Sequence, residues 1–436
     1  MKVFEKIKIV QNGTVVKRYK LFGLPVLKKL KGEKVVFWFL GIRIFSKVNK
    51  KFPMNVNDSE AYRNKIIKNL RKLKHIVLWL DHSLGGGTET YSVNTFVSSS
   101  ENVFFIRLQY FSSFETFVLS FPKSKSNKKL SFLSLGEVFK FLQNIKIKEI
   151  VVNNLVGYPD TTAVLHYVAD FKQVNGGIKV SFRGHDFQSI CPSFNLLNQD
   201  DKYCHLNYET GCENCLKNKK FAENEVHNKI LRSGATTLEL WRNAWNGFFE
   251  NTLDEFIAFS EEIAKIFYEI YPQLKGKTRI VPHEVRDYPQ IVIPQHKDIN
   301  IAVLGNISLI QKGEKIIGEM CKYLEDYKDV NLKIVGTYKK RRSKLKITGK
   351  YDPQDLPSIM KKENIDLVFI PSIWPETFSY TTAEAMSMGL PVACFNLGAP
   401  YERVRTYEKG LIINKMDAKY ALDEIVKFVK LLRRKK

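Results

Sequence analysis

The stretch that decides the fold is IDLVFIPSIWPETFSYTTAEAMSMGLPVACF, residues 365–395. An apolar run over Asp366–Ile370 is followed by a loop that carries Glu376, and a second apolar run covers Pro391–Phe395. The intervening Thr381–Met388 is expected to be helical. Two short apolar runs joined by a helix predict a βαβ unit with parallel, buried strands.

The same alternation continues on both sides of this unit. After residue 295 we expect further strands at Ile299–Leu304 and Asn331–Val335, with helices at Lys315–Leu324 and Gln354–Lys361. Starting at His75, an earlier set of strands is expected at His75–Leu80, Val103–Leu108, Ile150–Asn153, Ile178–Phe182 and Asp254–Ser260, with helices over Glu137–Asn144, Thr161–Phe171 and Ala222–Ser233. The sequence therefore predicts an α/β fold with two doubly wound, Rossmann-like domains facing a cleft.

Three parts are expected along the chain. Residues 1–70 form a basic N-terminal appendage, and residues 71–285 form the first Rossmann-like domain, with a cysteine-rich insertion at 187–216. Prolines 282, 289 and 294 mark a linker. Residues 295–436 form the second Rossmann-like domain, which ends in a basic helix.

The net charge of +24 is concentrated at the two ends of the chain. Residues 1–74 hold 20 Lys and Arg against 4 Asp and Glu, and the last ten residues hold six Lys and Arg and no acid. A nucleic-acid enzyme normally carries its positive charge along the folded body, so we expect no nucleic-acid partner. Basic ends fit an anionic membrane surface. The alternative is a lysine-rich composition that only keeps the protein soluble.

The apolar runs and the cysteine content indicate in which cell compartment the protein is found. No apolar run is long enough to span a membrane, and the first twenty residues lack the apolar core of a secretory signal. Six cysteines are too few for a disulfide scaffold in 436 residues. We therefore expect a cytoplasmic protein that binds peripherally to the inner face of a membrane. Two similar apolar runs, 21–27 and 39–45, predict a small basic hairpin or an interfacial patch.

Two glycine-containing loops follow the first strands of the two sheets. Gly85, Gly86 and Gly87 precede a helix whose free N–H groups favour an anion, although a plain tight turn is the alternative. In the second set, Gly305 is followed by Lys312, at a helix start suited to a diphosphate. The alternative there is an ordinary surface lysine. The phosphate-loop pattern of ATPases is absent from the sequence.

Two carboxylates mark the loop and helix of the opening stretch. Glu376 and Glu384 are eight residues apart, which is at most about 12 Å along a helix. Carboxylates accept hydrogen bonds from vicinal hydroxyls, so the pair could contact two hydroxyl-bearing rings of one ligand.

These motifs carry a resemblance to a known family. The Glu376-x7-Glu384 pair within PSxWPETFSYTxxEA and the following GLPV resemble the retaining GT-B glycosyltransferases of family 4, of the bacterial surface-polysaccharide type. LGGGTE at 84–89, RGHD at 183–186 and the Lys312-Gly313 pair fit the same family in the same order. The resemblance covers about residues 75–415.

The resemblance implies transfer of a sugar from a nucleotide-sugar donor, UDP-, GDP- or dTDP-linked, to a hydroxyl of a glycan or lipid-linked acceptor. It implies retention at the anomeric carbon, an N-terminal acceptor domain, a C-terminal donor domain and no cofactor for catalysis. Three residues would be catalytic: Glu376 at the donor sugar, His185 near the reacting centre and Lys312 at the leaving diphosphate. The donor-binding residues implied are Gly86, Gly87, Gly305, Asn306, Lys312, Thr377, Phe378, Ser379 and, at the ribose hydroxyls, Glu384.

The chain departs from the family pattern at two positions. Asn306 stands where many relatives have arginine, a loss that Arg341 or Arg342 could compensate, and Ser379 stands where glycine is common. Two other functions stay open: a nucleotide-sugar epimerase on the same fold, and a non-catalytic, membrane-docked scaffold with a degenerate donor site.

Four of the six cysteines lie close together in the sequence. Cys191, Cys204, Cys212 and Cys215 follow the RGHD segment, and the last two form a C-x-x-C pair. Clustered thiols in a reducing compartment predict a structural zinc site, with His205 as a substitute ligand. Unligated buried cysteines and a redox pair are the alternatives.

Overall fold

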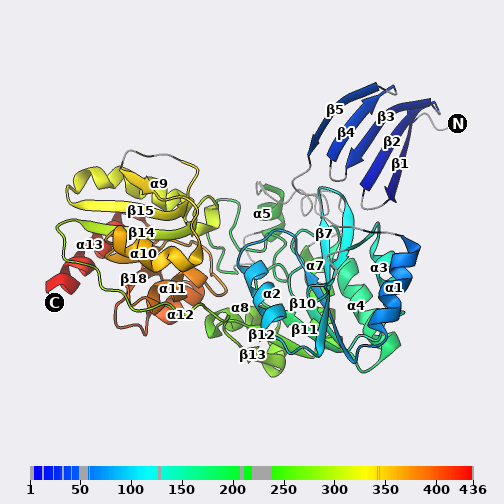
Figure 1. The fold of residues 1–436 in the computed structure, drawn as a ribbon. Coiled ribbons are helices and arrows are strands. Elements are labelled where there is room, and N and C mark those ends of the chain that lie inside the picture. The colour runs from blue at the N-terminus through cyan, green and yellow to red at the C-terminus, as the bar shows by residue number, and fades with distance from the viewer. Residues whose placement is uncertain are drawn as a thin grey trace. The chain divides into compact units, whose positions relative to one another are not determined.

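The computed structural model describes residues 4–11, 14–22, 24–31, 34–40, 42–48, 57, 59–125, 129–206, 211–218, 238–340, 342 and 344–434 (Figure 1). The chain divides into two compact units. The first consists of Met1–Arg183 and Phe221–Phe256, and the second of Gly184–Lys220 and Ile257–Lys436. The domain limits expected at residues 70, 285 and 295 stay predictions.

The N-terminal segment forms an antiparallel sheet of its own. Its strands follow one another in the order β1-β2-β3-β4-β5. Their bounds are Phe4–Gln11, Thr14–Leu21, Leu24–Lys31, Lys34–Phe39 and Ile42–Val48. The two repeats at 21–27 and 39–45 each cover the connection between two of these strands. Of the two alternatives expected for them, the small hairpin is replaced by a five-stranded meander, and the interfacial patch stays a prediction.

An eight-stranded sheet follows, in the order β13-β12-β11-β10-β6-β7-β8-β9. The central strands β10, β6 and β7 pair in parallel, while β7, β8 and β9 form an antiparallel edge. The strands β6 to β13 are His75–Asp81, Val103–Phe111, Thr116–Ser120, Leu130–Phe132, Glu149–Val152, Lys179–Arg183, Glu255–Ala258 and Thr278–Ile280. The helices before and among them are α1 Glu60–Leu70, α2 Gly87–Ser98, α3 Leu135–Leu142, α4 Thr161–Asn175, α5 Cys212–Asn218, α7 Leu238–Asn251 and α8 Glu261–Ile270.

The second unit is built on a six-stranded sheet in the order β16-β15-β14-β17-β18-β19. All of its strand pairs are parallel. The strands β14 to β19 are Ile299–Asn306, Val330–Thr337, Leu345–Ile347, Leu367–Ile370, Val392–Phe395 and Gly410–Ile413. The helices are α9 Glu314–Tyr323, α10 Leu356–Lys362, α11 Tyr380–Ser387, α12 Gly398–Val404 and α13 Ala418–Arg434.

The alternation expected from the sequence is thus confirmed, as is the α/β class with parallel sheets. The helix expected at Ala222–Ser233 lies outside the described residues. None of the described helices combines the length and the apolar character that crossing a membrane requires.

Two segments outside the six-stranded sheet complete its core. Leu197, in the cysteine-rich insertion, is buried in the same apolar cluster as Ile301 and Ile317. Lys315 on α9 donates a 2.7 Å hydrogen bond to Asp201 of the insertion. On the other side, Ile291 of the proline-containing segment is buried against strands of this sheet. Both segments therefore belong structurally to the second unit.

Candidate functional site

The loop after β17 buries the carboxylate of Glu376. The residue is only 3% exposed, and its side chain accepts a short hydrogen bond from Ser372. The ammonium of Lys312 lies 2.8 Å from the same carboxylate oxygen. Burial on its own would raise the pKa of Glu376, but Lys312 and the hydrogen bonds from Ser372 and Ser379 lower it below the ordinary value. Glu376 is therefore a buried anion.

Lys312 reaches Glu376 because the chain turns sharply behind it. Gly313 has φ +81°, and a Cβ atom there would lie 2.1 Å from the carbonyl oxygen of Pro371. Only glycine permits this approach between the start of α9 and the loop after β17. About a third of the Lys312 side chain is exposed, against 4% of the Glu376 side chain. Lys312 is therefore the accessible member of the pair, and a ligand phosphate would meet it first.

Glu384 lies on α11 in different surroundings. It is partly exposed, and burial raises its pKa above the ordinary value, opposed by Arg286. Its charge contributes to the raised pKa values of Tyr288 and Tyr351, so these two phenols lie near it. Tyr288 itself donates to the carbonyl of Pro353 at 2.6 Å. A carboxylate with a raised pKa is a strong acceptor for hydroxyl groups.

His185 and the loop after β17 are joined directly. The Thr377 hydroxyl donates to the backbone carbonyl of His185 at 2.9 Å, and both residues are buried. The structure thus brings together His185, Thr377, Glu376 and Lys312, which the sequence places at widely separated positions.

A stack of rings behind this loop was not expected from the sequence. His283 stacks on Phe378 with ring centroids 4.3 Å apart, and its centroid is 5.3 Å from that of His185. On Phe378 the guanidinium of Arg403 also lies 3.9 Å from the ring centroid. Burial, with a smaller contribution from Arg403, lowers the pKa of His283 to about 3, so the ring is neutral. A lone histidine in a proline-containing segment gives no sequence signal for this role.

Ser379 holds the turn into α11. Its φ of +67° is in the left-handed region, which explains why glycine would suit this position. The hydroxyl of Ser379 instead accepts a 2.9 Å hydrogen bond from Thr382. The serine therefore fixes the beginning of α11 through a side-chain contact that glycine lacks.

Gly305 and Asn306 end strand β14. Gly305 has φ +95°, and a Cβ there would lie 3.7 Å from Thr381 of α11. The side-chain oxygen of Asn306 accepts hydrogen bonds from the Ser308 amide at 3.2 Å and the Thr337 hydroxyl at 3.1 Å. Asn306 thus shapes the loop. Of the two arginines expected to compensate for it, Arg342 is exposed and Arg341 lies outside the described residues.

The glycine loop of the first unit lies at the N-terminus of α2. Gly85 and Gly86 have φ +82° and +84°, and a Cβ on either would meet nothing within 4 Å. Their backbone conformation, rather than a lack of space, calls for glycine. Gly87 is the first residue of α2. The loop therefore offers open backbone to a ligand, and its phosphate contact stays a prediction.

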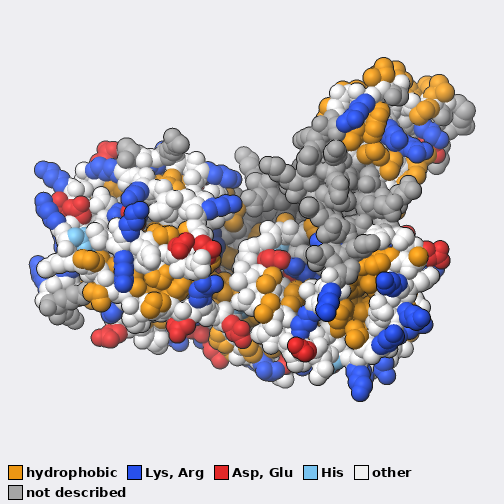
Figure 2. Space-filling view, in the orientation of Figure 1, with side chains coloured by type: hydrophobic (Ala, Val, Ile, Leu, Met, Phe, Trp, Pro, Cys, Tyr) orange, Lys and Arg blue, Asp and Glu red, His pale blue; other side chains and the backbone are white. Residues whose placement is uncertain are grey.

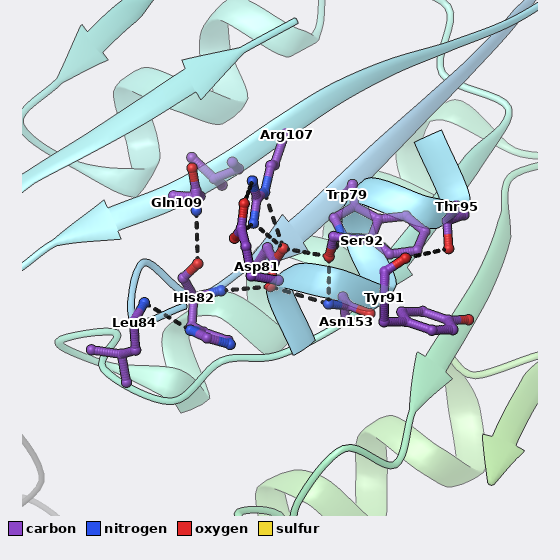
Figure 3. Close-up of polar contacts among 12 residues, drawn as sticks. Trp79, Asp81, His82, Leu84, Tyr91, Ser92, Thr95, Arg107, Gln109 and Asn153 are labelled. Carbon is purple, nitrogen blue, oxygen red and sulfur yellow. Dashed lines mark hydrogen bonds and ion pairs between the residues drawn. The ribbon is translucent and has the colours of Figure 1, made fainter. Parts of the chain in front are cut away.

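A buried polar network supports this loop from behind (Figure 3). Asp81, at the end of β6, is fully buried and receives two hydrogen bonds from Arg107 of β7, at 3.0 and 2.6 Å. Arg107 also donates to Glu89 of α2 at 2.9 Å, and its hydrogen bond is the main reason that the pKa of Glu89 is lowered. The network ties the first turn of α2 to the ends of two strands.

Further residues extend the network to the loop backbone. Ser92 and Asn153 donate to Asp81 at 2.7 and 3.1 Å. The Leu84 amide donates to Nδ1 of His82 at 2.8 Å, and burial lowers the pKa of His82, which keeps that nitrogen an acceptor. These residues were not predicted from the sequence. Arg107, the single charge within the apolar strand β7, was the available signal.

The cysteines of the insertion were predicted to hold a structural zinc ion. Cys191, Cys204, Cys212 and Cys215 are all of intermediate exposure, and none of the four forms a disulfide. The Cys191 thiol lies 3.2 Å from the Ser193 hydroxyl, to which it donates. Burial raises the pKa of Cys204, and the charges of the other three cysteines add to this. Across the described part of the chain, no three His, Cys, Asp or Glu side chains are arranged to hold an ion, so the zinc prediction is not supported.

Comparisons with known proteins relate this arrangement to sugar-transferring enzymes. Residues 287–435 match the family model described as Glycosyl transferases group 1. No curated protein sequence matches the chain.

Several solved structures share the fold. Anabaena Alr3699/HepE, in complex with UDP-glucose, superposes with a TM-score of 0.52 at 14% identity, covering 82% of this chain and 90% of that one. The apo form of the lipopolysaccharide outer core galactosyltransferase WaaB and the sucrose-phosphate synthase of Thermosynechococcus elongatus both give 0.51 at 13% identity, with 82% and 90% covered. The fold is therefore of the GT-B type, as the sequence motifs predict.

Proposed function

We propose that this protein is a nucleotide-sugar-dependent glycosyltransferase that transfers a sugar to a hydroxyl with retention of configuration. The observation that supports this most is the ion pair between Lys312 and Glu376, within the segment that matches the group 1 glycosyl transferases. The pair places a fixed, accessible cation beside a loop of buried polar groups. UDP and UDP-glucose are bound by structural neighbours of the same fold.

Lys312 would stabilise the negative charge that develops on the leaving diphosphate. A preorganised cation contributes most when it needs no rearrangement at the moment of reaction, and Glu376 holds Lys312 in place beforehand. The same charge is available to the diphosphate in the ground state, so Lys312 serves both binding and leaving-group departure.

The other proposed donor contacts follow from the surroundings of each residue. Glu384 would accept hydrogen bonds from the ribose hydroxyls, beside Tyr288 and Tyr351. The donor sugar would lie over the Thr377–Ser379 backbone, near His185. Among the first-unit residues, Gly86 and Gly87 would contribute backbone N–H groups to the phosphate.

We further propose that the acceptor is a glycan or a lipid-linked sugar in surface-polysaccharide synthesis. In this proposal the leaving phosphate takes the proton of the attacking hydroxyl, so no covalent sugar–enzyme intermediate and no metal is required. We likewise propose that the protein binds peripherally to an anionic membrane surface and that it belongs to family 4.

A thermal-shift screen of UDP-, GDP- and dTDP-sugars tests donor binding with the full chain. A specific donor binds only the native state and therefore raises the melting temperature. Lys312→Met should abolish the shift. Lys315→Met, which removes an exposed lysine three residues away, is the matched control and should retain it. No shift with any nucleotide sugar would contradict the proposal.

The anomeric outcome is tested by NMR of the product once a donor and an acceptor are known. The anomeric coupling should be the same in the donor sugar and the product. Inversion would contradict the retaining mechanism while leaving glycosyl transfer itself intact.

A non-catalytic scaffold is the second candidate. The observation that favours it is Asn306, whose side-chain oxygen is engaged by Ser308 and Thr337 at a position where related enzymes carry a cation. Nucleotide-sugar binding without release of nucleoside diphosphate, across a broad panel of acceptors, would support the scaffold.

A further inference from the structure

Large apolar side chains are exposed at one end of the N-terminal sheet. The β2–β3 and β4–β5 connections lie at the same end, because Leu21 pairs with both Phe4 and Leu24, while Leu27 of β3 pairs with Phe39. The residues there are all 44–72% exposed: Phe4, Leu21, Phe22, Leu24, Phe39, Leu40 and Ile42, hereafter the apolar end. Figure 2 shows hydrophobic and basic side chains side by side on this sheet. Exposed apolar groups gathered in this way mark an interaction site.

The backbone at this end is strained in a way that presents apolar side chains. Phe22 has φ +49° and Leu40 has φ +46°, both in the left-handed region. Glycine and asparagine adopt this conformation far more easily than Phe or Leu, for which it is unfavourable. These two side chains are also 58% and 64% exposed, so burial within the protein does not repay the strain. The same unfavourable backbone conformation at two equivalent turns indicates contact with an apolar partner.

A row of cations crosses the sheet just behind the apolar end. Arg18 pairs with Lys28, Lys28 with Trp38, and Trp38 with Arg43, so the four side chains lie on neighbouring strands. At about 3.3 Å per residue, the three cations, hereafter the cationic row, lie within roughly 13 Å of the apolar end. Like charges placed directly opposite one another, as in Arg18 and Lys28, destabilise a sheet unless an anion compensates them.

A second pair of like charges in the same sheet is compensated by a carboxylate of the protein itself. Lys8 and Lys17 are directly opposite, and both form ion pairs with Glu115. No such ion pair to a carboxylate is found for Arg18, Lys28 or Arg43 among the residues that the structure describes. The cationic row thus has the charge pattern of a surface whose counter-ions come from a partner.

We propose that the N-terminal sheet inserts its apolar end into an anionic phospholipid bilayer, with the cationic row at the level of the headgroups. The distance between the apolar end and the cationic row fits this arrangement, because interfacial segments bury apolar groups about 5–10 Å into the headgroup and acyl boundary. Each cation near an anionic leaflet adds to the attraction, and the apolar groups make it partly independent of salt. The inference does not depend on the proposed reaction, since it concerns a separate sheet.

Vesicle flotation of the full chain tests the apolar end. Wild-type protein should float with vesicles of phosphatidylcholine mixed with phosphatidylglycerol and bind phosphatidylcholine alone much more weakly. Phe22→Ser combined with Leu40→Ser should weaken binding at least roughly tenfold, since two large apolar groups no longer enter the bilayer. The matched control combines Val174→Ser with Val292→Ser, which removes two exposed apolar groups outside this sheet and should bind like wild type.

The cationic row is tested with Arg18→Gln, Lys28→Gln and Arg43→Gln combined. At about one kcal/mol per cation, binding to the anionic vesicles should fall roughly a hundredfold. The control variant combines Lys322→Gln, Lys361→Gln and Lys362→Gln, three lysines on helices of the second unit, and should lose far less.

Four results would overturn the proposal. The first is wild-type protein that fails to float with anionic vesicles, and the second is an unchanged affinity in both test variants. The third is self-association in analytical ultracentrifugation, abolished by Phe22→Ser with Leu40→Ser while vesicle binding persists, which would assign the apolar end to a second copy of this chain. The fourth is tighter binding of single-stranded RNA than of vesicles, which would identify another polyanion, and not the lipid, as the partner.

Discussion

Replacing Lys312 with methionine should destabilise the second unit more than replacing Glu376 with glutamine. At 2.8 Å and an effective dielectric constant of about 20, the attraction between the two charges is about 6 kcal/mol. A third of Lys312 is exposed, and screening by solvent reduces this to about 3 kcal/mol. Lys312→Met leaves the carboxylate buried without its cation, whereas Glu376→Gln leaves a cation that water can solvate. We expect losses of about 3 and about 1 kcal/mol.

The loss in Lys312→Met should also depend on pH. In the wild type the pKa of Glu376 is lowered, so the ion pair contributes its stability above the ordinary carboxylate pKa and loses it as the pH falls through the folded value. In the variant, burial acts without Lys312, and Glu376 takes up a proton at a higher pH. The destabilisation should therefore be larger at about pH 8 than at about pH 5.

The assay is urea unfolding of the full chain at both pH values, with hydrogen exchange of peptides from 365–395 to assign the transition. Lys315→Met is the control, because its pair with Asp201 is largely exposed and should contribute at most about 1 kcal/mol. The combined variant Lys312→Met/Glu376→Gln should recover part of the loss. An equal or larger loss in Glu376→Gln alone, or strictly additive losses, would refute this account of the pair.

Three further predictions concern other sites. Gly313→Ala should destabilise the second unit by roughly 2–4 kcal/mol and weaken nucleotide-sugar binding, because its Cβ would clash with the Pro371 carbonyl; an unchanged melting temperature would contradict this. Arg107→Met should cost about 3–5 kcal/mol by leaving Asp81 buried without its cation, which calorimetry of the full chain can measure. The depressed pKa of His283 contributes stability above the unfolded histidine pKa that is lost as the pH falls towards about 3. Wild type should therefore lose about 2 kcal/mol relative to His283→Gln between about pH 7 and pH 5, and parallel pH profiles would disprove it.

The sequence predicts the sheets well because their strands are nearly continuous apolar runs. β6, β14 and β17 begin within a residue or two of their expected positions, since burial on both faces leaves little ambiguity. The N-terminal sheet is harder to predict. Its strands mix lysine with apolar residues, so no continuous apolar run marks them, and the pairing with the neighbouring strand determines which residues face each other.

For the candidate site the sequence supplies residue identities, whose roles stay predictions, but not the contacts between the residues. The approach of Lys312 to Glu376 depends on two loops from different strands, and spacing along the chain does not reveal it. The buried arginine network around Asp81 depends on contacts between neighbouring strands, and the His283 stack depends on contacts between two loops. The described residues give the zinc prediction no support, since sequence proximity of cysteines does not by itself establish a metal-binding arrangement of their sulfur atoms.

The burial of Leu197 within the core of the six-stranded sheet limits how this protein can be recombined with others. A chimera that transplants residues 295–436 alone would leave out Leu197 and the Asp201 partner of Lys315, and would open a cavity in the transplanted core. An exchangeable module must therefore carry 184–206 along with the C-terminal segment, although nearly ninety residues of chain separate the two.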